Sequence, residues 1–157
     1  MRVNHIQIHG PITLTPVGNG HFRMDKALDF TVYTTDQQID AHIWKGFVTD
    51  FRSGGPFVDK FIDQFGETPK IQVSYLLHDL CYTKWLNKRH FKSRDWADDI
   101  LRACLIYAGM SKVKANLVWG AVRVFGKSAY TDDDQYSLAN ATKFSLCCIP
   151  RPIKVEI

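Results

Sequence analysis

The chain has 157 residues, enough for one domain with a buried core, and its 45% apolar and 23% charged residues are ordinary for a soluble globular protein. The net charge of +4 favours anionic surfaces such as phospholipid, but no Lys/Arg-rich block of the kind used to bind nucleic acid is present, so we expect no nucleic-acid partner. The N-terminus has no apolar signal segment and no run is long enough to span a membrane, which predicts synthesis in a cytoplasm without a signal peptide.

Residues 1–60 are expected to be mainly β-structure. Two runs of alternating apolar residues predict neighbouring strands: Leu28, Phe30 and Val32, then Ile39, Ala41 and Ile43. The polar residues 35–38 between them are typical of a turn, so the two strands should form an antiparallel hairpin. An earlier apolar series suggests further strands: Val3, Ile6, Ile8, Ile12 and Leu14.

Residues 69–126 predict three helices. The first should start after an N-cap at Thr68 and run to about Trp85. The second should begin at an N-cap, Ser93, and stop near Gly109, and the third should run from Ser111 to Gly126. Apolar residues recur at helical spacing in the third: Val113, Leu117, Ala121 and Phe125. Residues 131–157 are expected to be an extended tail, either disordered or a docking strand for a partner. The predicted fold is therefore a single α+β domain over residues 1–157, an antiparallel β hairpin or meander followed by a three-helix part.

One segment of the first predicted helix carries an inward-facing ionisable group. Five residues recur at steps of four, three, four and three, which defines one buried stripe: Ile71, Tyr75, His78, Tyr82 and Trp85. His78 and Tyr82 should therefore face the interior, while Asp79 should point to one side. A buried ionisable side chain needs partners, because leaving it unpaired is costly.

Asp98 on the second predicted helix is the candidate partner of His78. It shares a face with Leu101 and Leu105, whereas Asp99 lies with other charged residues on a solvated face. The alternative for Asp98 is a surface network with Arg94 and Arg102 at spacings of four residues. Both interpretations stay open on helical geometry alone.

A His78–Asp98 pair has a recognisable chemistry. A carboxylate bonded to one ring nitrogen fixes the tautomer and raises the basicity of the other, which can then deprotonate water. Tyr82 could hold Asp98 in place, and Asp79 could bind a hard cation such as calcium together with backbone carbonyls. The glycine-containing turn Ser53-Gly54-Gly55 is the candidate source of those carbonyls, with help from Asp50. The four cysteines fit neither a zinc site nor a regular disulfide framework, and are expected to be reduced: Cys81, Cys104, Cys147 and Cys148.

The segment His78-Asp79-Leu80-Cys81-Tyr82 resembles the His-Asp-x-Cys-Tyr signature of secreted phospholipase A2. In that family an aspartate on the antiparallel partner helix completes the dyad, with a cysteine six residues later, as Asp98 and Cys104 stand here. The resemblance implies that His78 is the base, Asp79 the calcium ligand, Asp98 the dyad partner and Tyr82 its support. The chain departs from that family where Ser74 and Ala97 replace cysteines, and where the calcium loop is reduced to Ser53-Gly54-Gly55.

A wider stretch, about residues 28–130, resembles a family of phage and bacterial proteins known as domain of unknown function 1353. The matching segments follow in the same order: Gly46-Phe47-Val48-Thr49-Asp50, Ser53, Pro56, His78-Asp79 with Tyr82, Ser93-Arg94-Asp95-Trp96-Ala97-Asp98 and Val122-Arg123-Val124-Phe125-Gly126. This resemblance implies a phage or prophage origin, with synthesis in the host cytoplasm, but no established activity.

Three functions remain open from the sequence. The first is a calcium-dependent, phospholipase A2-like hydrolase acting at a bacterial membrane phospholipid surface. The second is a non-enzymatic virion component of a tail or baseplate, assembled with other phage proteins, in which His78 and Asp98 form a buried structural network. The third, a metal phosphohydrolase, would need further inward histidines, for which His42 and His90 are poorly placed.

Overall fold

A computed structural model of the protein describes residues 1–18, 21–49, 68–82, 93–132 and 153–156. The chain divides into two compact units. One, the helical unit, contains residues 51–133 together with Met1, and the other, the β unit, contains residues 2–50 and 134–157. The α+β class predicted from the sequence is confirmed, whereas a single domain over residues 1–157 stays a prediction.

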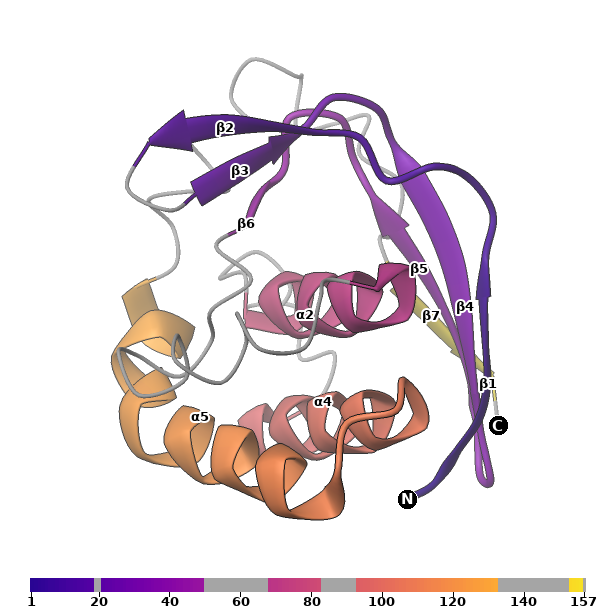
Figure 1. The fold of residues 1–157 in the computed structure, drawn as a ribbon, viewed down its shortest axis with the longest axis vertical. Helices are drawn as coiled ribbons and strands as arrows, with labels where there is room; N and C mark the ends of the chain where they lie inside the picture. Colours follow the sequence, from indigo (N-terminus) through magenta and orange to yellow (C-terminus); the bar gives the residue numbers. More distant parts are fainter. Residues whose placement is uncertain (19–20, 50–67, 83–92, 133–152, 157) are drawn as a thin grey trace. The chain divides into compact units, whose positions relative to one another are not determined.

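The β unit contains two antiparallel sheets (Figure 1). The four-stranded sheet has the order β1-β4-β5-β7 and is built from β1 (Val3–Ile8), β4 (Leu28–Thr34), β5 (Gln38–Ile43) and β7 (Ile153–Glu156). The three-stranded sheet has the order β2-β3-β6 and is built from β2 (Leu14–Gly18), β3 (His21–Met24) and β6 (Val48–Thr49).

The predicted hairpin is β4 and β5. Its register places Phe30 opposite Ala41 and Val32 opposite Ile39, so the alternating apolar residues form one buried face. The other face is polar, and there the Thr31 hydroxyl donates to Asp40 Oδ1 at 2.8 Å. The turn is closed by the Thr34 hydroxyl, which accepts the backbone N–H of Asp36 and of Gln37 at 3.2 and 3.0 Å.

The end of the chain differs from the prediction. Residues 153–156 form β7, which pairs antiparallel with residues 38–41 of β5. The predicted disorder is wrong for these four residues, and the strand docks on the chain's own sheet. Its short segment of backbone covers an edge that β5 would otherwise expose.

The helical unit contains three described helices, of which α2 and α4 begin, and α4 also ends, as their sequence signals predict. In α2 (Pro69–Tyr82) the backbone N–H of Ile71 donates to the Thr68 hydroxyl at 3.3 Å. In α4 (Arg94–Tyr107) Ser93 caps the N-terminus, and Gly109 adopts a φ of 102° just beyond the C-terminus. The Met110 N–H then reaches the Leu105 carbonyl at 3.0 Å, which completes a Schellman motif. Trp85 and the predicted last turn of the first helix lie outside the described residues.

The third helix, α5 (Lys112–Asp132), corrects two predictions. It continues through Gly126, which therefore does not stop it, because a glycine in helical conformation costs only about 1 kcal/mol relative to alanine. The predicted apolar series is also not the core face, since Val113, Leu117 and Phe125 are half or more exposed. The buried face of α5 is displaced around the helix and consists of Ala115, Val118, Val122 and Gly126.

The directions of the three helices follow from their side-chain partners. On α2, Ser74 interacts with Cys104, and His78, four residues later, meets Asp98, six residues earlier on α4. The two helices therefore run in opposite directions. Arg102 with Asn116 and Asp95 with Arg123 show the same reversal between α4 and α5. The helices are thus sequentially antiparallel, with α4 packed against both neighbours (Figure 1).

Candidate functional site

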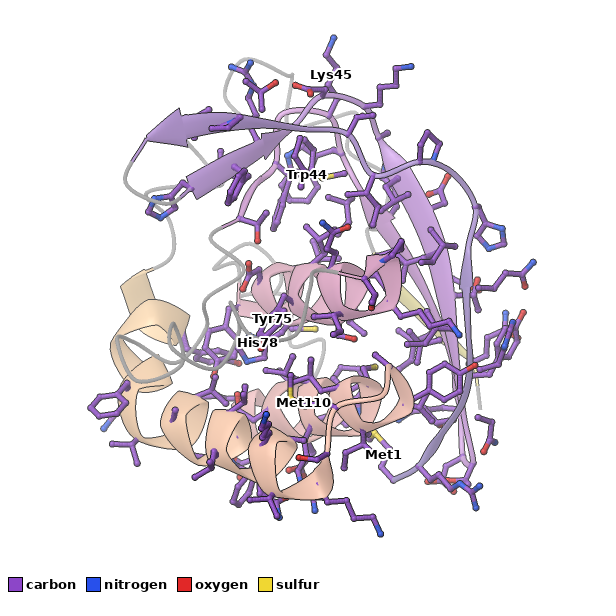
Figure 2. The ribbon with its side chains drawn as sticks, in the orientation of Figure 1. Met1, Trp44, Lys45, Tyr75, His78 and Met110 are labelled. Carbon is purple, nitrogen blue, oxygen red and sulfur yellow. The ribbon has the colours of Figure 1, made fainter. Side chains whose placement is uncertain are left out.

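His78 and Asp98 meet inside the helical unit. His78 Nε2 lies 3.0 Å from Asp98 Oδ1, and both side chains have an exposed fraction of 0%. Figure 2 shows the side chains of His78 and Tyr75 projecting from α2. Tyr75 is buried as well, and its burial raises the pKa of its phenol. The predicted His78–Asp98 contact is confirmed. The buried surface of α2 is wider than the single stripe predicted from the sequence. His78 therefore faces the neighbouring helix α4 and not solvent.

Tyr82 donates a second hydrogen bond to the same carboxylate oxygen. Its hydroxyl lies 2.5 Å from Asp98 Oδ1, and its ring lies 4.1 Å from the His78 ring, centroid to centroid. Burial, with the Asp98 contact, raises the pKa of the Tyr82 phenol, so this group stays a donor at neutral pH. The predicted supporting contact between Tyr82 and Asp98 is confirmed.

Gly126 makes room for the Tyr82 ring. A Cβ atom at this position would lie 2.8 Å from the Tyr82 hydroxyl oxygen and 3.2 Å from the nearest ring carbon. Any larger side chain on this turn of α5 would therefore displace Tyr82 from Asp98. The sequence predicted a helix stop at Gly126, whereas its role in the structure is this close approach.

The other ring nitrogen of His78 points away from Asp98. Within the described part of the chain, Nδ1 has no hydrogen-bond partner, and the nearest carboxylate oxygen, Asp79 Oδ1, is 3.8 Å away. Burial alone would lower the pKa of His78, but the hydrogen bond to Asp98 and the negative charges of Asp79 and Asp98 outweigh it and raise the pKa above the ordinary value. When the ring is neutral, the Asp98 carboxylate accepts a hydrogen bond from Nε2–H. This favours the tautomer that carries its proton on Nε2 and leaves Nδ1 unprotonated.

Two arginines face the second oxygen of Asp98. Arg94 Nε and Arg123 Nε lie 3.6 and 3.5 Å from Asp98 Oδ2. The predicted alternative is therefore present in part, since Arg94 joins Asp98, while Arg102 Nε instead donates to Asn116 Oδ1 at 2.5 Å. Asp98 thus receives the dyad hydrogen bonds on one oxygen and two cations on the other.

Arg123 was missed as a site residue. It lies in the Val-Arg-x-Phe-Gly segment, and this segment was the sequence signal that could have indicated it. Because Arg123 and Asp98 lie on different helices, their separation along the chain did not predict a contact. Its guanidinium also binds Asp95, approaches Asp99 Oδ1 at 3.5 Å, and stacks over the Trp119 ring at 5.1 Å. Asp99 is on the exposed side, as predicted, and accepts a hydrogen bond from Trp119 Nε1 at 2.9 Å.

The predicted calcium ligands are only partly within the described residues. Asp79 is there, with 13% of its side chain exposed, whereas Asp50, Ser53, Gly54 and Gly55 lie outside. Residues 1–18, 21–49, 68–82, 93–132 and 153–156 contain no group of three or more His, Cys, Asp or Glu able to hold a metal. Calcium binding stays a prediction, and no step below depends on it.

The described residues test the predictions for the cysteines and for His42 and His90 only in part. Cys81 and Cys104 are buried free thiols, as predicted for these two, and Cys147 and Cys148 lie outside the described residues. His42 Nδ1 lies 2.6 Å from Asp29 Oδ1 in the β unit, and His90 lies outside the described residues.

Comparison with known proteins places the chain in a family. Curated proteins and solved structures give no match. A family model described as "Protein of unknown function (DUF1353)" matches residues 24–122, well over half of the chain. The match includes His78, Asp79, Tyr82 and Asp98. The chain therefore belongs to the DUF1353 family of proteins of unknown function.

Proposed function

We propose that this protein is a phage-derived hydrolase of ester bonds in bacterial membrane phospholipid, with His78 as general base. The observation that carries the proposal is the polarity of the His78 ring. Nε2 lies 3.0 Å from Asp98 Oδ1, and Nδ1 has no hydrogen-bond partner among the described residues. This arrangement agrees with the roles that the phospholipase A2 resemblance implies.

The proposed reaction uses the dyad twice. His78 Nδ1 takes a proton from water as the water oxygen bonds to the ester carbonyl carbon. Asp98 keeps the Nε2 proton in place and stabilises the imidazolium, while Tyr82 holds Asp98. The tetrahedral intermediate then breaks its bond to the leaving alkoxide, which takes the proton from Nδ1. The products are one fatty acid and one lysophospholipid.

Calcium and the phage context belong to the same proposal. Asp79 and Asp50, with the backbone carbonyls of Ser53, Gly54 and Gly55, are the proposed calcium ligands, since carboxylate and carbonyl oxygens are the donors calcium prefers. When bound, the ion would polarise the ester carbonyl. The proposed setting is synthesis in the host cytoplasm followed by association with the virion.

A second candidate function is a non-enzymatic virion protein of a tail or baseplate. The observation that favours it is the burial of the dyad, because His78 and Asp98 both have side chains with an exposed fraction of 0%. A buried polar network can specify a core without catalysing a reaction. In that case His78 and Asp98 would contribute to stability alone.

Fatty-acid release distinguishes the two functions. Wild type and His78→Gln are incubated with phosphatidylglycerol and phosphatidylethanolamine vesicles, with calcium and with a chelator, and melting temperatures are recorded in parallel. The enzyme proposal expects release by wild type and about a 10²–10⁴-fold loss in His78→Gln, because a general base contributes that much. The matched control is His42→Gln, which removes a histidine bonded to a carboxylate in the β unit and should keep full activity.

The contrary result is equally clear. A folded wild-type protein that releases no fatty acid from any of these vesicles contradicts the enzyme proposal. If His78→Gln also lowers the melting temperature, the contact between His78 and Asp98 is explained by its contribution to stability.

A further inference from the structure

One face of α5 carries apolar side chains that are exposed in the structure. Val113 and Val124 have exposed fractions of 71% and 70%, and Leu117 has 51%. Phe125, next to Val124, is also 51% exposed. These four account for most of the exposed large hydrophobic side chains in the described residues, and all four lie on one helix.

Three of the exposed residues share a side of the helix. At 100° per residue, Val113, Leu117 and Val124 fall within about 40° of one another around the axis, whereas Phe125 lies about 80° from Leu117, next to the buried Val118. The buried residues Ala115, Val118 and Val122 lie on the opposite side, against the rest of the helical unit. We name the exposed residues Val113, Leu117 and Val124 the α5 outer face.

Lysines border the α5 outer face. Lys112 and Lys127 are exposed and Lys114 is half-buried, and residues 112–127 contain no Asp or Glu. An apolar strip with basic borders is the pattern of helices that lie in the plane of an anionic membrane surface, with the apolar side chains among the acyl chains and the lysines at the phosphates. No helix in the described part of the chain is long and apolar enough to cross a membrane.

We propose that the α5 outer face docks the protein on a bilayer of anionic phospholipid, with Val113, Leu117 and Val124 entering the interface and Lys112 and Lys127 contacting lipid phosphates. Charge complementarity selects this occupant, since the lysines match phosphate groups. The inference rests on the proposed function only in that the same lipid would be the substrate, because docking itself requires no reaction at His78.

Vesicle co-sedimentation tests the docking without catalysis. The vesicles are made of ether-linked phosphatidylglycerol, which has no ester to cleave, or of ether-linked phosphatidylcholine, which has no net charge. We expect wild type to bind the phosphatidylglycerol vesicles more tightly, and high salt to weaken this binding. The double variant Leu117→Gln/Val124→Gln should bind about tenfold more weakly through lost apolar burial, and Lys112→Glu at least about fivefold.

Two control variants match these changes in the β unit. Val17 is 46% exposed on β2, so Val17→Gln removes a comparable exposed valine, and Lys45→Glu reverses an exposed lysine outside α5. Both should bind as wild type does. Circular dichroism checks that every variant keeps its helix content.

The outcomes separate this inference from the proposed function. Vesicle binding that depends on the α5 outer face supports the inference even when wild type hydrolyses no ester lipid, a result that would contradict only the proposed function. Absence of binding, or equal binding by wild type and the double variant, overturns the inference whatever the hydrolysis assay shows. A third outcome also overturns the inference: the wild type forms dimers in sedimentation experiments, the double variant does not, and neither binds vesicles. The α5 outer face would then bind a second copy of the chain.

Discussion

The carboxylate of Asp98 is the central group of the site at the scale of single residues. One oxygen accepts from Tyr82 at 2.5 Å and lies 3.0 Å from His78 Nε2, and the other lies near the Nε atoms of Arg94 and Arg123. A buried carboxylate without such partners would be strongly destabilising. The arginines therefore make it possible for a charged Asp98 to remain at the dyad.

Substitution of Gly126 tests the Tyr82–Asp98 contact. In Gly126→Ala the new Cβ would lie 2.8 Å from the Tyr82 hydroxyl oxygen, so the ring must move away from Asp98. We expect a loss of about 1–3 kcal/mol in the free energy of unfolding, measured by urea denaturation. The control is Gly120→Ala on the same helix, where a Cβ meets nothing within 4 Å, and where alanine should stabilise by up to about 1 kcal/mol. Equal effects of the two substitutions would contradict the close approach.

At the scale of elements, the antiparallel contact of α2 and α4 positions the dyad. Ser74 interacts with Cys104 one turn before His78 meets Asp98. Burial raises the pKa of the Cys104 thiol to about 12, against the opposing effect of the Ser74 hydrogen bond. Burial keeps this thiol from reagents in solution, but it lies where a cysteine at position 74 would meet it.

Cysteine at position 74 should therefore cross-link the helices. We expect Ser74→Cys to form a disulfide with Cys104 under mild oxidation, because the two side chains already interact. A bridge of this span stabilises by about 4 kcal/mol in the chain-entropy description. Peptide mapping under non-reducing conditions identifies the bridge, and Ser74→Ala serves as the control. If the cysteines at positions 74 and 104 both remain free thiols after oxidation, α2 and α4 do not pack in this register.

Local signals predicted most of the elements, and tertiary packing decided the rest. Thr68, Ser93 and Gly109 lie at helix ends as expected, because caps depend on neighbouring backbone groups. The buried face of α5 could not be predicted, because Val113, Leu117 and Phe125 are as apolar as the residues that are buried. Which of two apolar faces is covered depends on how α5 packs against the neighbouring helix, and the spacing of residues within α5 does not contain that information.

The candidate site shows the same division. Helical spacing placed His78 and Asp98 on inward faces, and the contact followed. Arg123 lies on a third helix, and no spacing within α2 or α4 indicated that its guanidinium would approach Asp98. The β7 strand was also missed, since its pairing with β5 joins residues more than a hundred positions apart.

In the whole molecule, the proposed chemistry and the proposed membrane contact both belong to the helical unit. The dyad lies on α2 and α4, and the α5 outer face lies on the side of α5 opposite its buried residues. The β unit completes a sheet from both ends of the chain, with β1 at one edge and β7 at the other. Family membership covers parts of both units, since the match runs from residue 24 to residue 122.

Nitrogen-15 NMR of the His78 ring across a pH titration tests the central claim, that this histidine can act as a base at Nδ1. Because Asp79 and Asp98 raise the pKa of His78, the midpoint should lie above that of an ordinary histidine, and fatty-acid release should rise with pH through the same midpoint as the ring becomes neutral. Above the midpoint we predict the neutral ring with its proton on Nε2, bonded to Asp98, and an unprotonated Nδ1. A neutral ring with its proton on Nδ1 would contradict the account.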